Sequence, residues 1–183
     1  MSGTPPPLSP ILLLLVVAIA SMTTNNGFLL LPAVHANVRS SINKNEMIMP
    51  YSLGVRDSIM IAHSFHNHPA FGPAGGVHGA TYTCDVEFQC RRLNPETNWV
   101  LDIGKASDVV CEVLQKYNLK NLDEVFGKDV MTTTEFMARQ IHDDVQERLE
   151  QECQEFNGRV CVKLWESHKA WASFQGTGRV SYK

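Results

Sequence analysis

The sequence predicts an α+β fold, in which an antiparallel four-stranded sheet has two helices packed on one face. Three observations predict it. Several segments alternate apolar and polar residues with period two, which is typical of strands covered on one side only. Two other segments carry apolar stripes at helical spacing. The segments follow one another as strands, then helices, then strands. We expect residues 47–176 to form this single domain.

The first 36 of the 183 residues differ in composition from the rest, because they contain no Lys, Arg, Asp or Glu. Residues 11–20 are an unbroken apolar run, half of the roughly 20 residues that span a bilayer. We interpret residues 1–36 as a secretory signal or targeting leader. A disordered, uncleaved extension and a longer bipartite signal are the alternatives. Residues 37–46 would be a linker and residues 177–183 a C-terminal tail. The expected location is the secretory pathway or an organelle reached through it, with the mature form soluble and membrane contact limited to targeting.

Composition narrows the classes of partner and site. The formal net charge is −3 and the pI about 6.1, without a Lys- or Arg-rich tract, so we expect no nucleic acid as partner. The five cysteines are an odd number and form no C-x-x-C pair, which argues against a thiolate zinc site or a redox site. We expect them to be small buried apolar residues.

Strands are predicted first along the domain. Residues 58–64 alternate in character and are followed by a Gly- and Pro-rich loop over 64–76. A long strand is predicted over 78–90, where every second residue is apolar or His. A short strand is expected at 99–101. Two further strands are predicted at 159–166 and 170–174, joined by a turn.

Two helices are predicted between these strands. Asp102 precedes the first, whose apolar stripe is Ala106, Val109, Val110, Val113, Leu114 and Tyr117. Residues 118–128 read as irregular. The second helix opens with a capping box, Thr132 as N-cap and Glu135 at the third helical position. Its stripe is Met137, Ile141, Val145, Leu149 and Cys153.

Four of the seven histidines, His63, His66, His68 and His78, flank the Gly- and Pro-rich loop. Catalytic zinc takes three protein ligands and keeps one position open, and two strand ends with a loop between them could bring such imidazoles together. The alternative is that the loop histidines are solvated and bind nothing.

Carboxylates and hydroxyls supply the remaining candidates. Glu166 ends an alternating strand, where it could accept two parallel N–H groups from a ligand or lie exposed at a frayed end. Thr133 and Thr134 could hold a ligand at a helix N-terminus, although capping explains threonines there equally well. Asp123 and Glu124 could act as acid and base, or form a solvated turn.

These segments, taken in order, resemble the 6-pyruvoyl-tetrahydropterin synthase and 6-carboxytetrahydropterin synthase family over roughly residues 47–174. The resemblance rests on Ile61-Ala62-His63, on Gly76-Val77-His78-Gly79-Ala80-Thr81-Tyr82, on Asn98-Trp99-Val100-Leu101-Asp102, on Leu122-Asp123-Glu124, on Thr133-Thr134-Glu135 and on Leu164-Trp165-Glu166-Ser167.

The resemblance implies a tunnelling-type fold, a homo-hexameric ring and active sites between subunits. It implies a zinc cofactor on histidines, with His63 and His78 at two ligand positions, and a zinc-assisted elimination on 7,8-dihydroneopterin triphosphate. It also implies that Glu166, with Thr133 and Thr134, binds the pterin substrate, and that Asp123 belongs to the catalytic group. In the carboxy-type relatives, the resemblance implies that side-chain carbon is lost instead.

The sequence departs from the family pattern at three places. Ala80 stands where the third zinc-binding histidine is expected. Residues 71–76, where the family has its catalytic cysteine, contain no cysteine. Glu124 stands where an assisting histidine is expected. One hypothesis is an enzyme with a rebuilt site, in which His66 or His68 is the third ligand and Glu124 or a loop histidine the base. The other is a non-catalytic descendant that binds a pterin or has a structural role.

Overall fold

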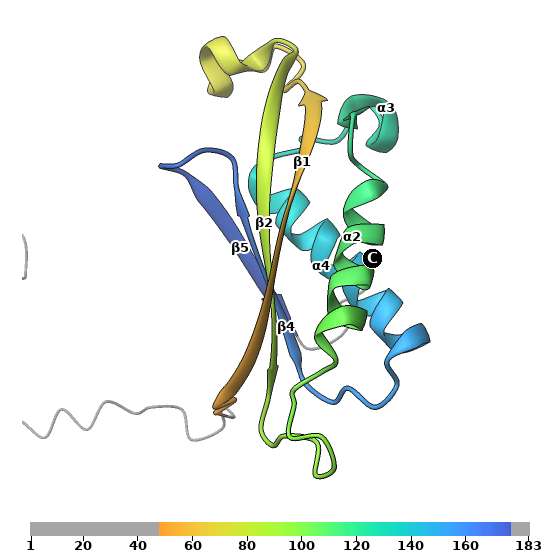
Figure 1. Cartoon of the computed structure of the whole chain (residues 1–183). Coiled ribbons are helices and arrows are strands. Elements are labelled where there is room, and N and C mark those ends of the chain that lie inside the picture. Colours follow the sequence, from red (N-terminus) through yellow and green to blue (C-terminus); the bar gives the residue numbers. More distant parts are fainter. Residues whose placement is uncertain (1–47, 177–183) are drawn as a thin grey trace, which may run out of the picture. The chain divides into compact units, whose positions relative to one another are not determined.

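The structure is a computed structural model that describes residues 48–176. One mixed sheet has the strand order β3-β1-β2-β4-β5, with helices on one of its faces (Figure 1). The strands are β1 (Tyr51–His63), β2 (His78–Cys90), β3 (Lys120–Asn121), β4 (Arg159–Trp165) and β5 (Trp171–Gly176). The helices are α2 (Ile103–Gln115), α3 (Leu122–Phe126) and α4 (Thr134–Glu152), with a 3₁₀ segment η1 (Pro69–Gly75). The predicted α+β class is confirmed.

The register of the β1–β2 hairpin positions the functional end of the sheet. The two strands pair antiparallel along their whole length, from Tyr51 opposite Cys90 to His63 opposite His78. Residues directly opposite each other on neighbouring antiparallel strands point to the same face. The pairing therefore brings two imidazoles, 15 positions apart in sequence, side by side where η1 connects the strands.

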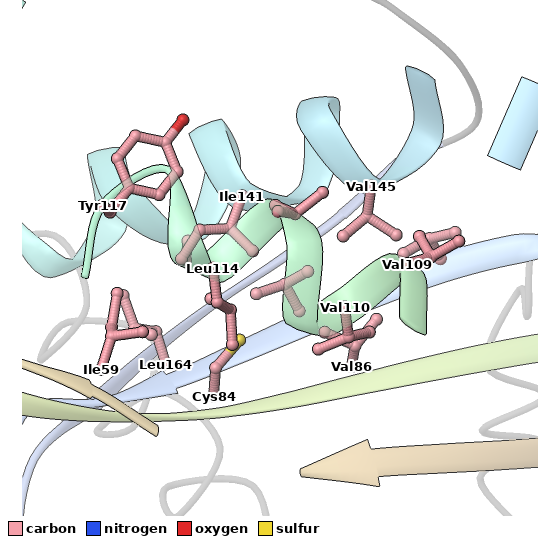
Figure 2. Close-up of a cluster of buried hydrophobic side chains, with 14 of the residues drawn as sticks. Ile59, Cys84, Val86, Val109, Val110, Leu114, Tyr117, Ile141, Val145 and Leu164 are labelled. Carbon is pink, nitrogen blue, oxygen red and sulfur yellow. The ribbon is translucent and has the colours of Figure 1, made fainter. Parts of the chain in front are cut away.

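The covered face of the sheet forms the core with α2 and α4. Every second residue of β2 from Tyr82 to Phe88 is fully buried, as the alternation predicted. Figure 2 shows part of this cluster, with side chains from the helices lying above those of the strands. Its labelled members are Ile59, Cys84, Val86, Val109, Val110, Leu114, Tyr117, Ile141, Val145 and Leu164. Burying each large aliphatic side chain contributes about 1.5–3 kcal/mol.

Both long helices begin at a residue whose side chain caps the helix N-terminus. The Asp102 carboxylate accepts hydrogen bonds from the amides of Gly104 and Lys105 at 2.8 and 3.1 Å, so it caps α2 as predicted. Helix α4 begins one residue later than predicted, since the Thr133 hydroxyl is the cap and accepts from the amide of Phe136 at 3.3 Å. This leaves Thr132 outside the helix.

The sheet differs from the predicted one in its number of strands and in being mixed rather than antiparallel. It has five strands rather than four, because Lys120–Asn121 adds a two-residue parallel strand beside β1. Residues 118–128, predicted as irregular, therefore contain β3 and α3. Leu119 enters this strand with φ of 58° and donates its amide to the Met60 carbonyl, a long-range contact that no local pattern reveals.

Other element boundaries also differ from the predicted ones. Strand β1 begins at Tyr51 rather than at 58, because pairing with β2 continues past the polar residues Arg56 and Asp57. Residues 99–101 are not a strand, and the predicted loop over 64–76 contains η1. The predicted leader, linker and tail lie outside the described residues. Within residues 48–176, no helix has the length and apolar character that crossing a membrane requires.

Candidate metal and pterin site

His63 and His78 come together at the end of the β1–β2 hairpin. Their Nε2 atoms are 3.0 Å apart, and their ring centroids are 4.5 Å apart. His63 is fully buried and His78 partly buried. Phe65 packs edge-on against His63 and tilted against His78, which limits the movement of both rings.

The other ring nitrogens fix the tautomer of each histidine. Nδ1 of His63 lies 3.0 Å from the Thr132 carbonyl oxygen, and Nδ1 of His78 lies 2.9 Å from that of Gly76. A carbonyl can only accept, so each Nδ1 carries a proton. When both rings are neutral, the facing Nε2 atoms therefore present two lone pairs with no hydrogen between them. Two facing lone pairs repel each other, and a cation bound between them removes this repulsion. Metal-binding histidines usually donate their other ring N–H to a carbonyl or carboxylate, as both rings do here.

Electrostatics keeps the buried imidazole neutral. Burial lowers the pKa of His63, and the neighbouring His78 acts in the same direction. The hydrogen bond to Thr132 and the charges of Glu166 and Asp123 act in the opposite direction but do not outweigh burial. A neutral imidazole is the form that binds a metal ion.

Glu166 is the third member of this cluster. It follows β4 directly, and ligand atoms of His63, His78 and Glu166 all lie within 4.8 Å of one another. Its Oε2 accepts a hydrogen bond of 2.7 Å from the Thr134 hydroxyl. Two imidazoles and one glutamate are a donor set found in catalytic zinc sites, so the residues present fit a metal of the kind the resemblance implies.

Tyr82 adds a polar group at the same end of the core. Its ring meets that of His63 edge-on, with centroids 6.3 Å apart. The hydroxyl is buried. Burial raises the pKa of Tyr82, and the charge of Glu166 raises it further, so this phenol stays protonated.

A second polar network adjoins the histidine pair. Both the hydroxyl and the amide of Ser64 donate to Asp123, at 2.6 and 3.1 Å. Nδ1 of His66 lies 3.2 Å from the same hydroxyl oxygen. Burial acts to raise the pKa of Asp123, but the two Ser64 hydrogen bonds and the charges of His66 and His63 outweigh it and leave that pKa lowered. Asp123 is therefore a carboxylate at neutral pH.

The remaining predicted site residues lie apart from the three-residue cluster. His68 is exposed, and its Nδ1 accepts from the amide of Ala70 as the cap of η1. Glu124 is exposed in the first turn of α3, and Thr133 caps α4. Of the predicted metal ligands, the structure thus brings together His63 and His78. The third donor within reach is Glu166, predicted to bind the substrate, rather than His66 or His68.

Some supporting groups were not singled out from the sequence. The Thr132 and Gly76 carbonyls are backbone groups, which residue type does not reveal. Ser64 and Tyr82 had a weak signal, since one directly follows the first histidine and the other carries a hydroxyl on an otherwise apolar strand face. A buried hydroxyl needs a partner, and that requirement could have marked both.

Comparison with known proteins identifies the family. The family profile described as 6-pyruvoyl tetrahydropterin synthase matches residues 52–177. The chain belongs to this family. No protein in the curated collection matches the chain. The match covers both long helices and the whole sheet except Tyr51, the first residue of β1, so the family assignment predicted from sequence motifs is confirmed.

Solved structures show the same fold. The 6-pyruvoyl tetrahydropterin synthase of Caenorhabditis elegans superposes with a TM-score of 0.58 at 23% identity, covering 72% of this chain and 100% of that one. The Plasmodium falciparum enzyme gives a TM-score of 0.54 at 13% identity, covering 69% and 97%. A Plasmodium vivax catalytic-residue mutant gives 0.53 at 16%, with the same coverage. The family comprises lyases of pterin biosynthesis.

Proposed function

We propose that this protein is a metal-dependent lyase that eliminates triphosphate from 7,8-dihydroneopterin triphosphate. The observation that carries the proposal is the pair of facing Nε2 atoms, 3.0 Å apart, with a carboxylate close by. The arrangement occurs at the end of a hairpin in a chain whose family acts on pterins. Family membership supports the substrate class, and the donor set supports the metal.

His63 and His78 would hold the metal ion, for which we propose zinc. When bound, such an ion stabilises negative charge that develops on a substrate oxygen. The Thr132 and Gly76 carbonyls hold both rings in the tautomer that exposes Nε2. Phe65 covers the pair on one side and keeps water from that part of the rings.

We assign proton handling to His66, in place of the assisting histidine that Glu124 replaces. Ser64 has one hydroxyl hydrogen and donates it to the Asp123 carboxylate, so Nδ1 of His66 must donate to the Ser64 oxygen. Nε2 of His66 is 3.4 Å from the Val130 carbonyl, at the outer limit of a hydrogen bond. This nitrogen is therefore the ring atom available to exchange a proton with the substrate.

The backbone of the loop positions His66. His66 and Asn67 adopt positive φ angles of 51° and 56°, a conformation uncommon for residues other than glycine, although Asn and His adopt it more often than most. The Gly75 carbonyl accepts from the amides of Phe65 and Asn67 and so fixes the loop. The conformation directs the imidazole towards Ser64 rather than into solvent.

Recognition of the pterin ring belongs to the same proposal. Thr133 caps α4 and Thr134 is its first residue, and Glu166 at the end of β4 accepts a hydrogen bond from Thr134. We also propose a homo-hexamer, in which neighbouring subunits complete the substrate pocket, and a location in the secretory pathway or an organelle reached through it.

The test is triphosphate release by the purified full chain, loaded with zinc and given 7,8-dihydroneopterin triphosphate. The His66→Gln variant should lower kcat by about 100-fold or more, because general acid–base catalysis contributes at least that much. The Asp108→Asn variant, changed on an exposed turn of α2, is the matched control and should keep the wild-type rate. Metal-loaded protein that binds the pterin but releases no triphosphate would support the non-catalytic alternative instead.

A further inference from the structure

The position of the missing imidazole is occupied by a side chain that cannot bind metal. Ala80 lies two residues after His78 on β2, on the same face, and pairs with Ile61. We propose that Glu166, from the end of β4, supplies the third ligand, so that the ion is held by two histidines and one carboxylate. This inference rests on the metal site of the proposed function and changes the role of Glu166 within it.

Distances favour this donor. Ions such as zinc bind imidazole and carboxylate at about 2.0–2.2 Å, so the donor atoms around one ion lie about 3–4 Å apart. The two Nε2 atoms already meet that spacing at 3.0 Å, and the Glu166 oxygen lies within 4.8 Å of both. Glu166 is exposed, so its carboxylate is open to an ion that enters from solvent.

Each of the three ligands has an outer-shell partner. The histidines donate from Nδ1 to the carbonyls of Thr132 and Gly76, and Glu166 accepts through Oε2 from Thr134. The Thr134 hydroxyl engages one carboxylate oxygen and leaves the other free for the ion. Such partners normally orient metal ligands, and here they come from three separate segments of the chain.

The loop histidines are not part of this group of donors. Nδ1 of His66 bonds Ser64, and its Nε2 points to the Val130 carbonyl. His68 is exposed and uses Nδ1 to cap η1. Neither ring belongs to the group of donors that converges at the hairpin end. The carboxylate is thus the side chain in place to compensate for Ala80.

Two consequences follow for the chemistry of the site. A carboxylate ligand reduces the net charge of the ion with its ligands from +2 to +1. Two imidazoles with one carboxylate oxygen also suit Fe²⁺, Mn²⁺ and Co²⁺ beside Zn²⁺, because selectivity follows ligand type and geometry. Glu166 is then bound to the ion in the loaded protein, so capturing the pterin ring with both oxygens is not its role there.

The test measures metal binding by the full chain, with Zn²⁺ and Co²⁺ as probes. Apo-protein is titrated in competition with a chromophoric chelator, and bound metal is counted by elemental analysis. We expect one ion per chain in the wild type. Glu166→Gln should weaken binding by about 100-fold or more, because changes in the outer shell alone cost 10–100-fold. It should also change the visible absorption of bound Co²⁺.

Two further variants keep the test decisive. Ala80→His in the Glu166→Gln background should restore tight binding by returning an imidazole to the face that carries His78. Glu150→Gln, an exposed change on α4, should bind as the wild type does. A melting curve for each variant shows that it is folded. Wild-type affinity in folded Glu166→Gln would overturn the inference.

The outcome also separates this inference from the proposed function. If metal binding depends on Glu166 but no triphosphate is released, Glu166 remains the third ligand and the proposed lyase activity is refuted. If triphosphate is released but metal binding does not depend on Glu166, the proposed lyase activity stands and the assignment of Glu166 as a ligand is refuted.

Discussion

Removing the Thr134 hydroxyl should weaken metal binding without unfolding the protein. Thr134→Val keeps the shape of the side chain and deletes the 2.7 Å hydrogen bond to Oε2 of Glu166. A hydrogen bond to a charged group contributes about 1.5–3 kcal/mol. Thr134 is buried, but Glu166 is exposed, so water competes for the carboxylate and the lower end applies. About 1.5 kcal/mol corresponds to roughly tenfold weaker binding.

The assay is the competitive titration of apo full-length protein with Zn²⁺, run beside a thermal melt. Thr83→Val is the matched control, because Thr83 lies on the uncovered face of β2, where its hydroxyl is 3.5 Å from that of Ser58. Equal affinity of Thr134→Val and wild type would refute the idea that Thr134 orients a metal-binding carboxylate. Equal loss in both variants would show that the effect is not specific to the site.

Three further predictions concern the fold around the site. Thr133→Ala should lower the free energy of unfolding by about 1 kcal/mol through loss of the α4 cap, measured by urea denaturation, and an unchanged midpoint would contradict this capping role. Asp123 has a lowered pKa in the folded state, so its contribution to stability is present above about pH 4 and is lost as the pH falls further. Asp123→Asn should therefore melt below the wild type at pH 7, and the gap should narrow towards pH 3; a constant gap would count against the assignment. Iodoacetamide at pH 8 should modify exposed Cys111 in the native protein and spare Cys84, whose pKa burial raises to about 12, and peptide mass spectrometry reads the result.

The fold was predictable wherever one local pattern decided the structure. The alternation over β2 and the Asp102 cap of α2 gave those elements directly. The second cap was misplaced because Thr132 and Thr133 are adjacent and both fit a cap. The structure decides between them through a tertiary contact, since the Thr132 carbonyl bonds to His63. Strand β3 was missed because it forms only by pairing with β1, and two residues carry no periodicity.

The candidate site was predictable where local strand patterns place its residues, and not where tertiary contacts do. His63 and His78 stand at the ends of strands whose pairing follows from alternation, so their meeting could be anticipated. The loop histidines could not be placed, because their directions depend on positive φ angles and on the Gly75 carbonyl. Glu166 was recognised as a site residue, but its distance from the histidines depends on the β2–β4 register, which the sequence does not encode locally.

The three donor residues lie far apart along the chain, at positions 63, 78 and 166, although they meet at one end of the sheet. An ion bound there acts as a cross-link that closes one short and one long loop of the polypeptide. Cross-links of this kind disfavour the unfolded chain by restricting it, and the restriction grows slowly with loop length. Heat resistance should therefore follow the metal supply: chelation should lower the melting temperature of the whole domain, and protein made without metal should be degraded faster by proteases.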